Sequence, residues 1–127
     1  MESAIAQVTE RLGGLDGLVN IAGGFAWETV SDGSVDTWNR LFDVSLRTAL
    51  TVSRAALPML KSSKGSIVNI GAAASARAGA GMGAYAASKA CVSRLTEALA
   101  EEVKDDGVRV NAVLPSIIDT PANRADM

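Results

Sequence analysis

Short apolar runs alternate with long amphipathic stretches along the chain, and this alternation constrains the fold more than any other feature. The runs at residues 15–24, 64–71 and 108–115 are rich in Val, Ile and Leu and too short for ordinary helices. Between them, residues 35–60 and 82–103 repeat apolar side chains at helical spacing. Strands that alternate with helices predict an α/β layer with parallel strands and right-handed crossovers. We expect the first run to be a strand that is buried on both faces.

Several local signals set the expected boundaries of these elements. Residues 2–12 have the spacing of an amphipathic helix, which Gly13 and the glycine after it would end. Pro58 is expected near the end of the helix that begins at residue 35. Residues 72–83 form a loop of small side chains, and residues 116–127 are predicted to be irregular.

Composition excludes several classes of function. With 12 basic and 14 acidic residues the net charge is −2, which offers no basic patch for nucleic acid. The chain has no histidine, which removes Ser-His and Cys-His nucleophiles and most metal sites. The longest uncharged run, residues 65–76, is far shorter than the about twenty residues that a membrane helix needs. The single cysteine, Cys91, has no partner for an internal disulfide. We therefore expect a cytoplasmic protein with no metal, nucleic-acid or membrane partner.

The strongest chemical signal is the pair Tyr85 and Lys89, in the sequence Tyr-Ala-Ala-Ser-Lys. Residues four apart lie on one face of a helix, and a nearby ammonium stabilises a phenolate. The spacing therefore predicts that the pKa of Tyr85 lies below its usual value, which suits proton transfer. An ordinary exposed pair without a function is the alternative. The pair follows a predicted strand, and the ends of parallel strands are where the active sites of such sheets form.

Four sequence blocks together resemble the short-chain dehydrogenase/reductase family in their order and spacing. They are LDGLVNIAG, the helix that contains VDTWNRLFDVSL, GSIVNIG followed by YAASK, and VRVNAVLP with DT beyond it. The resemblance covers nearly the whole chain. It implies one partial domain over residues 1–127: part of a Rossmann-like, doubly wound parallel sheet with about three strands and three helices.

The family resemblance also implies an activity and a set of site residues. It implies an oxidoreductase that uses NAD or NADP on a small-molecule substrate, in a homo-oligomer. Tyr85 would be the catalytic proton donor or acceptor, and Lys89 would lower its pKa and bind the nicotinamide ribose. The remaining cofactor contacts would come from Asn20, Ala22 and Gly23 on the adenosine side and from Pro115, Ile118 and Thr120 near the carboxamide.

This sequence departs from the family pattern on the substrate side. Ala72 stands where the family has a substrate-orienting serine, and whether Ser75 supplies the missing hydroxyl stays open. Ser45 stands at a helix position where the family has an asparagine, and Ser116 follows Pro115 where glycine is usual. Without the serine, either the site is inactive or its substrate needs no such hydrogen bond. The strings IAGGFA, GAAASA and GMGAYAASKA are similar to dihydropteridine reductase-like members, which indicates a pterin-like or other conjugated substrate; a relative with another substrate is the alternative.

The glycine-rich motif that binds the cofactor pyrophosphate in this family is missing from the sequence. The chain therefore resembles the carboxyl-terminal half of the fold, and a truncated or non-catalytic dimerisation module is the alternative to an enzyme. Residues 79–84 match G-x-G-x-x-A but lie too far from the preceding strand, so we interpret them as a loop that positions Tyr85. Phe25 and Trp27 either touch a planar substrate or pack within their loop.

Overall fold

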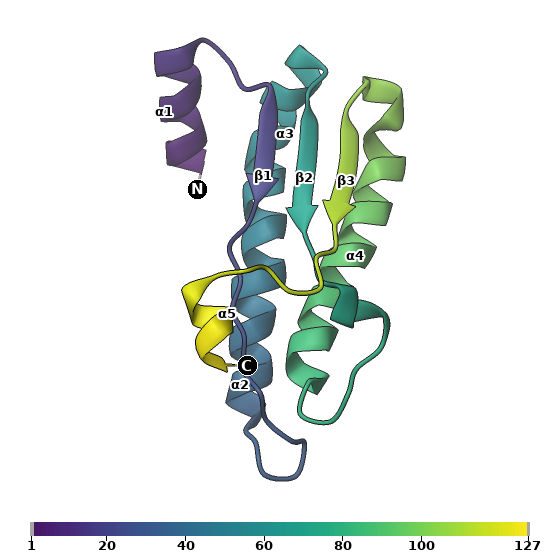
Figure 1. Ribbon diagram of the computed structural model, residues 1–127. Coiled ribbons are helices and arrows are strands. Elements are labelled where there is room, and N and C mark those ends of the chain that lie inside the picture. Colours follow the sequence, from purple (N-terminus) through teal and green to yellow (C-terminus); the bar gives the residue numbers. More distant parts are fainter. Residues whose placement is uncertain (1, 127) are drawn as a thin grey trace.

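The computed structural model describes residues 2–126, which form an open sheet of three parallel strands in the order β1-β2-β3 (Figure 1). The strands are β1 (Gly17–Asn20), β2 (Ser66–Ile70) and β3 (Arg109–Val113). In their register Leu18 lies opposite Ile67, and Ile67 lies opposite Val110. The predicted α/β fold class and the three strand positions are confirmed. All three strands end at the same edge of the sheet (Figure 1).

Two long helices cover one face of the sheet (Figure 1). The core between them and the strands contains Ala56, Leu60, Ile67, Leu99, Val103 and Val110. The helices in chain order are α1 (Glu2–Leu12), α2 (Val35–Leu41), α3 (Thr48–Ser63), α4 (Gly83–Val103) and α5 (Pro121–Asp126). Short helical turns are η1 (Phe42–Arg47), η2 (Ala73–Ala76) and η3 (Lys104–Asp106). Among residues 2–126, no helix has the length and apolar character needed to span a membrane.

The first strand differs from its predicted burial. Val19 is 55% exposed, and Val113 on β3 is also exposed, because the described helices cover only the opposite face of the sheet. Within the described chain β1 pairs only with β2, which leaves its outer edge without a strand partner. The expectation of a strand buried on both faces is therefore wrong for this chain.

The helical regions extend further than the sequence predicted. The helix expected at residues 35–60 runs without a break from Val35 to Ser63, with Pro58 inside α3 and the π-helical turn η1 in its middle. A π turn takes up one extra residue without ending the helix, so the apolar residues on either side still predict one continuous helix.

The tail predicted to be irregular contains α5. Thr120 caps this helix, since the Asn123 N–H donates to its Oγ1 at 3.1 Å, and Pro121 occupies the first helical position. A threonine followed by proline is a helix-start signal, so the start of α5 is encoded in the sequence.

A buried polar network ties the strand ends to both long helices. The Asn20 amide donates to Asn69 Oδ1 at 2.8 Å and to Ser53 Oγ at 3.2 Å. The Asn69 amide in turn donates to Thr96 Oγ1 at 3.0 Å. Asn69 is completely buried, and its neighbours lie on β1, α3 and α4. The network therefore fixes where the carboxyl ends of β1 and β2 lie relative to α4.

Candidate active site

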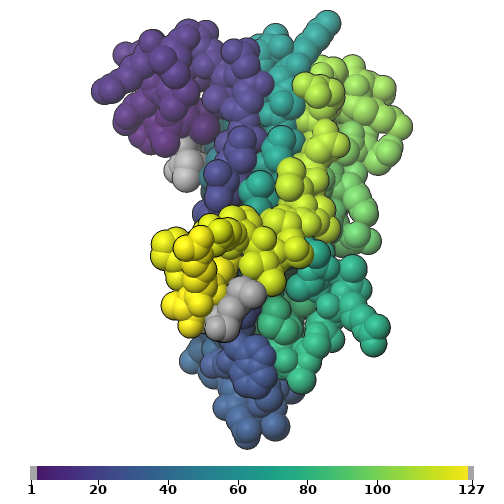
Figure 2. All heavy atoms as spheres, in the orientation of Figure 1, coloured from purple at the N-terminus to yellow at the C-terminus, as the bar shows by residue number. Residues whose placement is uncertain are grey.

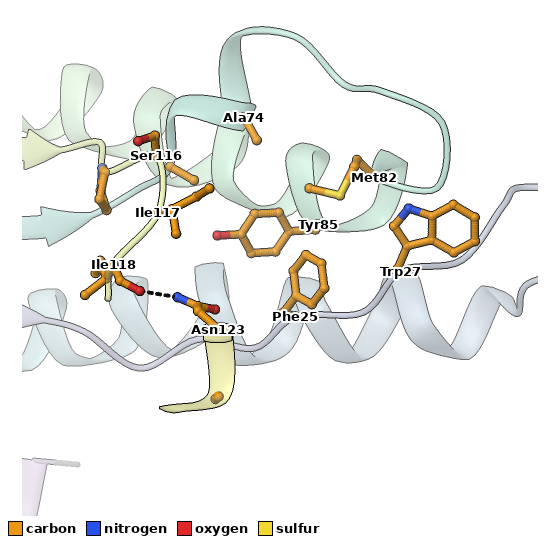
Figure 3. Close-up of a pocket in the computed structure, with 12 residues that line it drawn as sticks. Phe25, Trp27, Ala74, Met82, Tyr85, Ser116, Ile117, Ile118 and Asn123 are labelled. Atoms are coloured by element: carbon orange, nitrogen blue, oxygen red, sulfur yellow. Dashed lines mark hydrogen bonds between the residues drawn. The ribbon is translucent and has the colours of Figure 1, made fainter. Parts of the chain in front are cut away.

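A cavity of about 720 Å³ lies beyond the carboxyl ends of the strands, between the start of α4 and the segment that leads into α5. Figure 2 shows that segment and α5, in yellow, crossing the molecule below the strands. A volume of this size accommodates an ordinary small-molecule ligand. The walls include Phe25, Trp27, Ala72, Ala74, Met82, Tyr85, Pro115, Ser116, Ile117, Ile118 and Asn123 (Figure 3).

Tyr85 lies in the first turn of α4 and points its ring into the cavity (Figure 3). Its ring packs edge to face against Phe25, with centroids 5.0 Å apart. Burial raises the pKa of the Tyr85 phenol above its usual value of 10.0, because a phenolate loses hydration there. The predicted lowering of this pKa is therefore wrong. Desolvation outweighs any effect of the Lys89 ammonium, which is hydrogen-bonded elsewhere.

Lys89 lies one helical turn further along α4 and is 6% exposed. Its Nζ donates to the carbonyl oxygen of Ile70, at the end of β2, at 3.0 Å. Burial lowers the pKa of Lys89, because the ammonium is partly desolvated. Among the described residues no carboxylate forms a salt bridge with it. An ammonium has three N–H donors, so two remain for other acceptors.

Gly23 and Ser45 lie beside this ammonium. A Cβ built on Gly23 would come within 3.1 Å of Lys89 Nζ and 3.5 Å of Ser45 Oγ, so glycine leaves space that a larger residue would fill. Ser45 is 1% exposed, and its hydroxyl has no hydrogen-bond partner among the described residues. Buried polar groups of this kind normally find a partner. Near Gly23, just after β1, the Lys89 ammonium of α4 and the Ser45 hydroxyl of η1 therefore lie close together.

Only some of the other predicted site residues lie at the cavity. Pro115, Ile118 and Ala72 line the same cavity as Tyr85. Ser75 does not line it, and its hydroxyl donates to the Ala72 carbonyl at 2.7 Å.

Five of the predicted cofactor residues lie outside the cavity wall: Lys89 and Gly23, described above, and Thr120, Asn20 and Ala22. The hydroxyl of Thr120 is the cap of α5, and the amide of Asn20 is held in the network described above. Ala22 is exposed after β1. The roles assigned to these residues stay predictions.

Several wall residues carry no functional signal in the sequence. They are Met82 and Ile117 in loops, Ala74 in η2 and Asn123 in α5, where no periodicity marks them. The Asn123 amide donates to the Ile118 carbonyl at 2.7 Å, which ties α5 to the cavity wall (Figure 3). The helix-start signal at Thr120 and Pro121 was the one available indication that Asn123 would be ordered.

The residues around the Lys89 ammonium fit the ribose and nicotinamide of a dinucleotide. A desolvated ammonium with unused donors suits a sugar diol, and the space left by Gly23 allows close approach to the backbone. Within residues 2–126, no tight glycine-rich turn joins a strand directly to a helix, which is the cradle that a pyrophosphate requires. The described chain thus fits one end of the cofactor.

Parallel strands with an ionisable pair at their carboxyl ends give the arrangement that α/β proteins use for ligand sites at that edge. The chain belongs to the short-chain dehydrogenase family, whose family model matches residues 1–126. It is 37% identical over 120 residues to meso-2,3-butanediol dehydrogenase of Serratia marcescens, covering 94% of this chain and 48% of that protein. It is 38% identical over 119 residues to trans-4-hydroxycyclohexanecarboxylate dehydrogenase of Sinomonas cyclohexanicum, covering 94% and 46%.

A solved structure of the same family is also similar to this chain. A short-chain dehydrogenase from Mycobacterium smegmatis superposes with a TM-score of 0.85 at 39% identity, covering 92% of this chain and 50% of that one. The chain therefore spans about half the length of the relatives it matches.

Proposed function

We propose that this chain carries the proton-transfer and nicotinamide-ribose end of an NAD- or NADP-dependent dehydrogenase or reductase. One observation carries the proposal: Tyr85 faces the cavity while Lys89, one turn away, presents its ammonium at the end of β2, 3.0 Å from Ile70 O. Bound NAD or NADP would supply or accept a hydride. Tyr85 would give a proton to the substrate oxygen, or take one from it, and Lys89 would hold the ribose hydroxyls.

The Tyr85 phenol is protonated at neutral pH, as a phenol ordinarily is, so it has a proton to give in the reductive direction. Burial by itself raises its pKa and makes it a weaker acid. A phenol that has given up its proton needs a nearby positive charge, and Lys89 lies one helical turn away. In the ribose-bound site we propose that this ammonium stabilises the phenolate as it forms.

On the substrate we propose a small molecule whose carbonyl or imine is already activated by conjugation, either a pterin-like ring or another conjugated system. Ala72 offers no hydroxyl, and the Ser75 hydroxyl is already used within the loop. The sequence strings that resemble dihydropteridine reductase-like members favour the pterin-like alternative. The single cysteine, Cys91, supports a cytoplasmic location.

Deuteride transfer from 4-deuterated NADH to a panel of conjugated ketones and quinonoid dihydropterins, read by mass spectrometry with the full chain, tests the proposal. We expect transfer by the wild type and its loss in Tyr85→Phe and Lys89→Met. Lys104→Met, an exposed lysine beyond the end of α4, is the matched control and should leave transfer unchanged. Because the pyrophosphate cradle is missing from the described residues, NADH should bind no tighter than about millimolar. Full transfer by Tyr85→Phe, or none by the wild type, would contradict the proposal.

A second candidate function, a non-catalytic dimerisation module, is supported by a groove between α2, η1 and α4. Its walls include Trp38, Phe42, Ala87 and Cys91, and the Trp38 and Phe42 side chains are partly exposed. Apolar side chains left on two adjacent helices suit a second copy of the chain. We propose this groove as the contact of the homo-oligomer expected from the family.

A further inference from the structure

Two large aromatic side chains stand half in solvent at the mouth of the cavity. Phe25 is 51% exposed and Trp27 is 60% exposed, and both line the cavity together with Met82 (Figure 3). They come from the loop after β1, whereas Met82 precedes α4. Apolar area exposed inside a concavity marks a surface that a ligand covers.

This aromatic wall is held in place. The Glu28 N–H donates to the Gly81 carbonyl at 3.0 Å, which joins the loop that carries Trp27 to the loop before α4. The Trp27 indole packs so closely on Gly81 that a Cβ at that position would overlap it. Phe25 is fixed by its edge-to-face contact with Tyr85. Contacts on both sides therefore hold the aromatic wall in a preformed arrangement.

The cavity wall lacks ionic side chains among the described residues. Its polar side chains are Tyr85, Ser116 and Asn123, and the Asn123 amide already donates to the Ile118 carbonyl. The amino end of α4 lies near through Met82, but a helix end carries only a fraction of a charge and does not replace a counterion. A carboxylate or a heavily hydrogen-bonding ring would lose water here without finding enough partners.

We propose that this cavity takes an uncharged substrate in which the reacting carbonyl or alcohol is attached to a flat aromatic hydrocarbon ring. The ring lies against Trp27, Phe25 and Met82, and the oxygen faces Tyr85. The inference rests on the proposed function, because it assigns the substrate class of the same site. It makes Trp27 and Phe25 the residues that determine specificity.

Ligand binding to the full wild-type chain without cofactor tests this class, by saturation-transfer NMR and titration. The probes are 2-acetylnaphthalene, cyclohexyl methyl ketone, 2-naphthoate and pterin. We expect 2-acetylnaphthalene to bind about tenfold more tightly than the cyclohexyl ketone, from aromatic contacts, and at least about tenfold more tightly than 2-naphthoate. Equal binding of the two ketones, or tighter binding of 2-naphthoate or pterin, would overturn the inference.

Variants locate the binding and reverse its charge preference. Trp27→Leu and Phe25→Leu should each weaken 2-acetylnaphthalene about fivefold while leaving the cyclohexyl ketone unchanged. Trp38→Leu, which removes the other indole outside this cavity, should leave the ratio of the two ketones as in the wild type. Met82→Lys should strengthen 2-naphthoate about tenfold relative to 2-acetylnaphthalene. Ratios within one variant cancel any loss of folded protein.

The outcomes separate this inference from the proposed function. Ring-selective binding without deuteride transfer would uphold the site and defeat the proposed reaction. Tyr85-dependent transfer without ring selectivity would uphold the reaction and overturn the inference. Unchanged affinity in both Trp27→Leu and Phe25→Leu would also overturn it.

Discussion

Replacing Asn69 with alanine should destabilise the fold by roughly 3 kcal/mol. The substitution removes the hydrogen bonds to Asn20 and Thr96, each worth about 1 kcal/mol net. It also leaves unfilled space where the amide was completely buried, which costs about 1 kcal/mol more. The loss is limited because the neighbours keep other partners: Asn20 still donates to Ser53, and Thr96 to the Val92 carbonyl.

Urea unfolding followed by circular dichroism measures this loss at one fixed protein concentration, since any self-association would shift the midpoint. With an m-value of about 1.5 kcal/mol per molar, the midpoint should fall by about 2 M. The matched control is Asn111→Ala, an exposed asparagine on the neighbouring strand β3, which should change stability by less than about 0.5 kcal/mol. Equal midpoint shifts for the two variants would refute the reasoning, because they would show that the buried network adds nothing.

Three further predictions concern ionisation and assembly. An ultraviolet titration of Tyr85, the only tyrosine, should give a pKa above 10.0, and a value below it would contradict the dominance of burial. Because burial lowers the pKa of Lys89 from 10.5, the unfolded chain holds this proton to higher pH than the folded chain. The free energy of unfolding should therefore rise with pH between the lowered pKa of Lys89 and 10.5, and Lys89→Met should flatten that rise. The comparison is made below pH 10, where Tyr85 stays protonated. An equal slope in both proteins there would refute the prediction. The open edge of β1 and the exposed Val19 predict that the chain dimerises, exchanges elements or aggregates, and light scattering from a monodisperse 13.0 kDa monomer would contradict this.

The sequence predicts the positions of the helices and strands better than it predicts where individual side chains point. Strand positions follow from short Val- and Ile-rich runs, and the placement of Tyr85 and Lys89 on one helix follows from their spacing. That Lys89 Nζ binds the Ile70 carbonyl depends on how α4 crosses β2, which no local pattern encodes. The pKa of Tyr85 is raised, and not lowered as the sequence predicted, because the burial of its phenol is a property of the assembled cavity.

The contact between Trp27 and Gly81 couples the shape of the cavity wall to the position of the helix that carries Tyr85. Gly81 has a φ of +80° and lies two residues before the helix that carries Tyr85. A smaller side chain at Trp27 therefore also removes a support of the backbone that leads into α4 and Tyr85. Under the proposed function, broadening the range of accepted molecules at this wall should come with a loss of rate for all of them. A directed-evolution campaign would escape that trade-off more easily from the Ile117 side, where the wall belongs to a segment separate from α4.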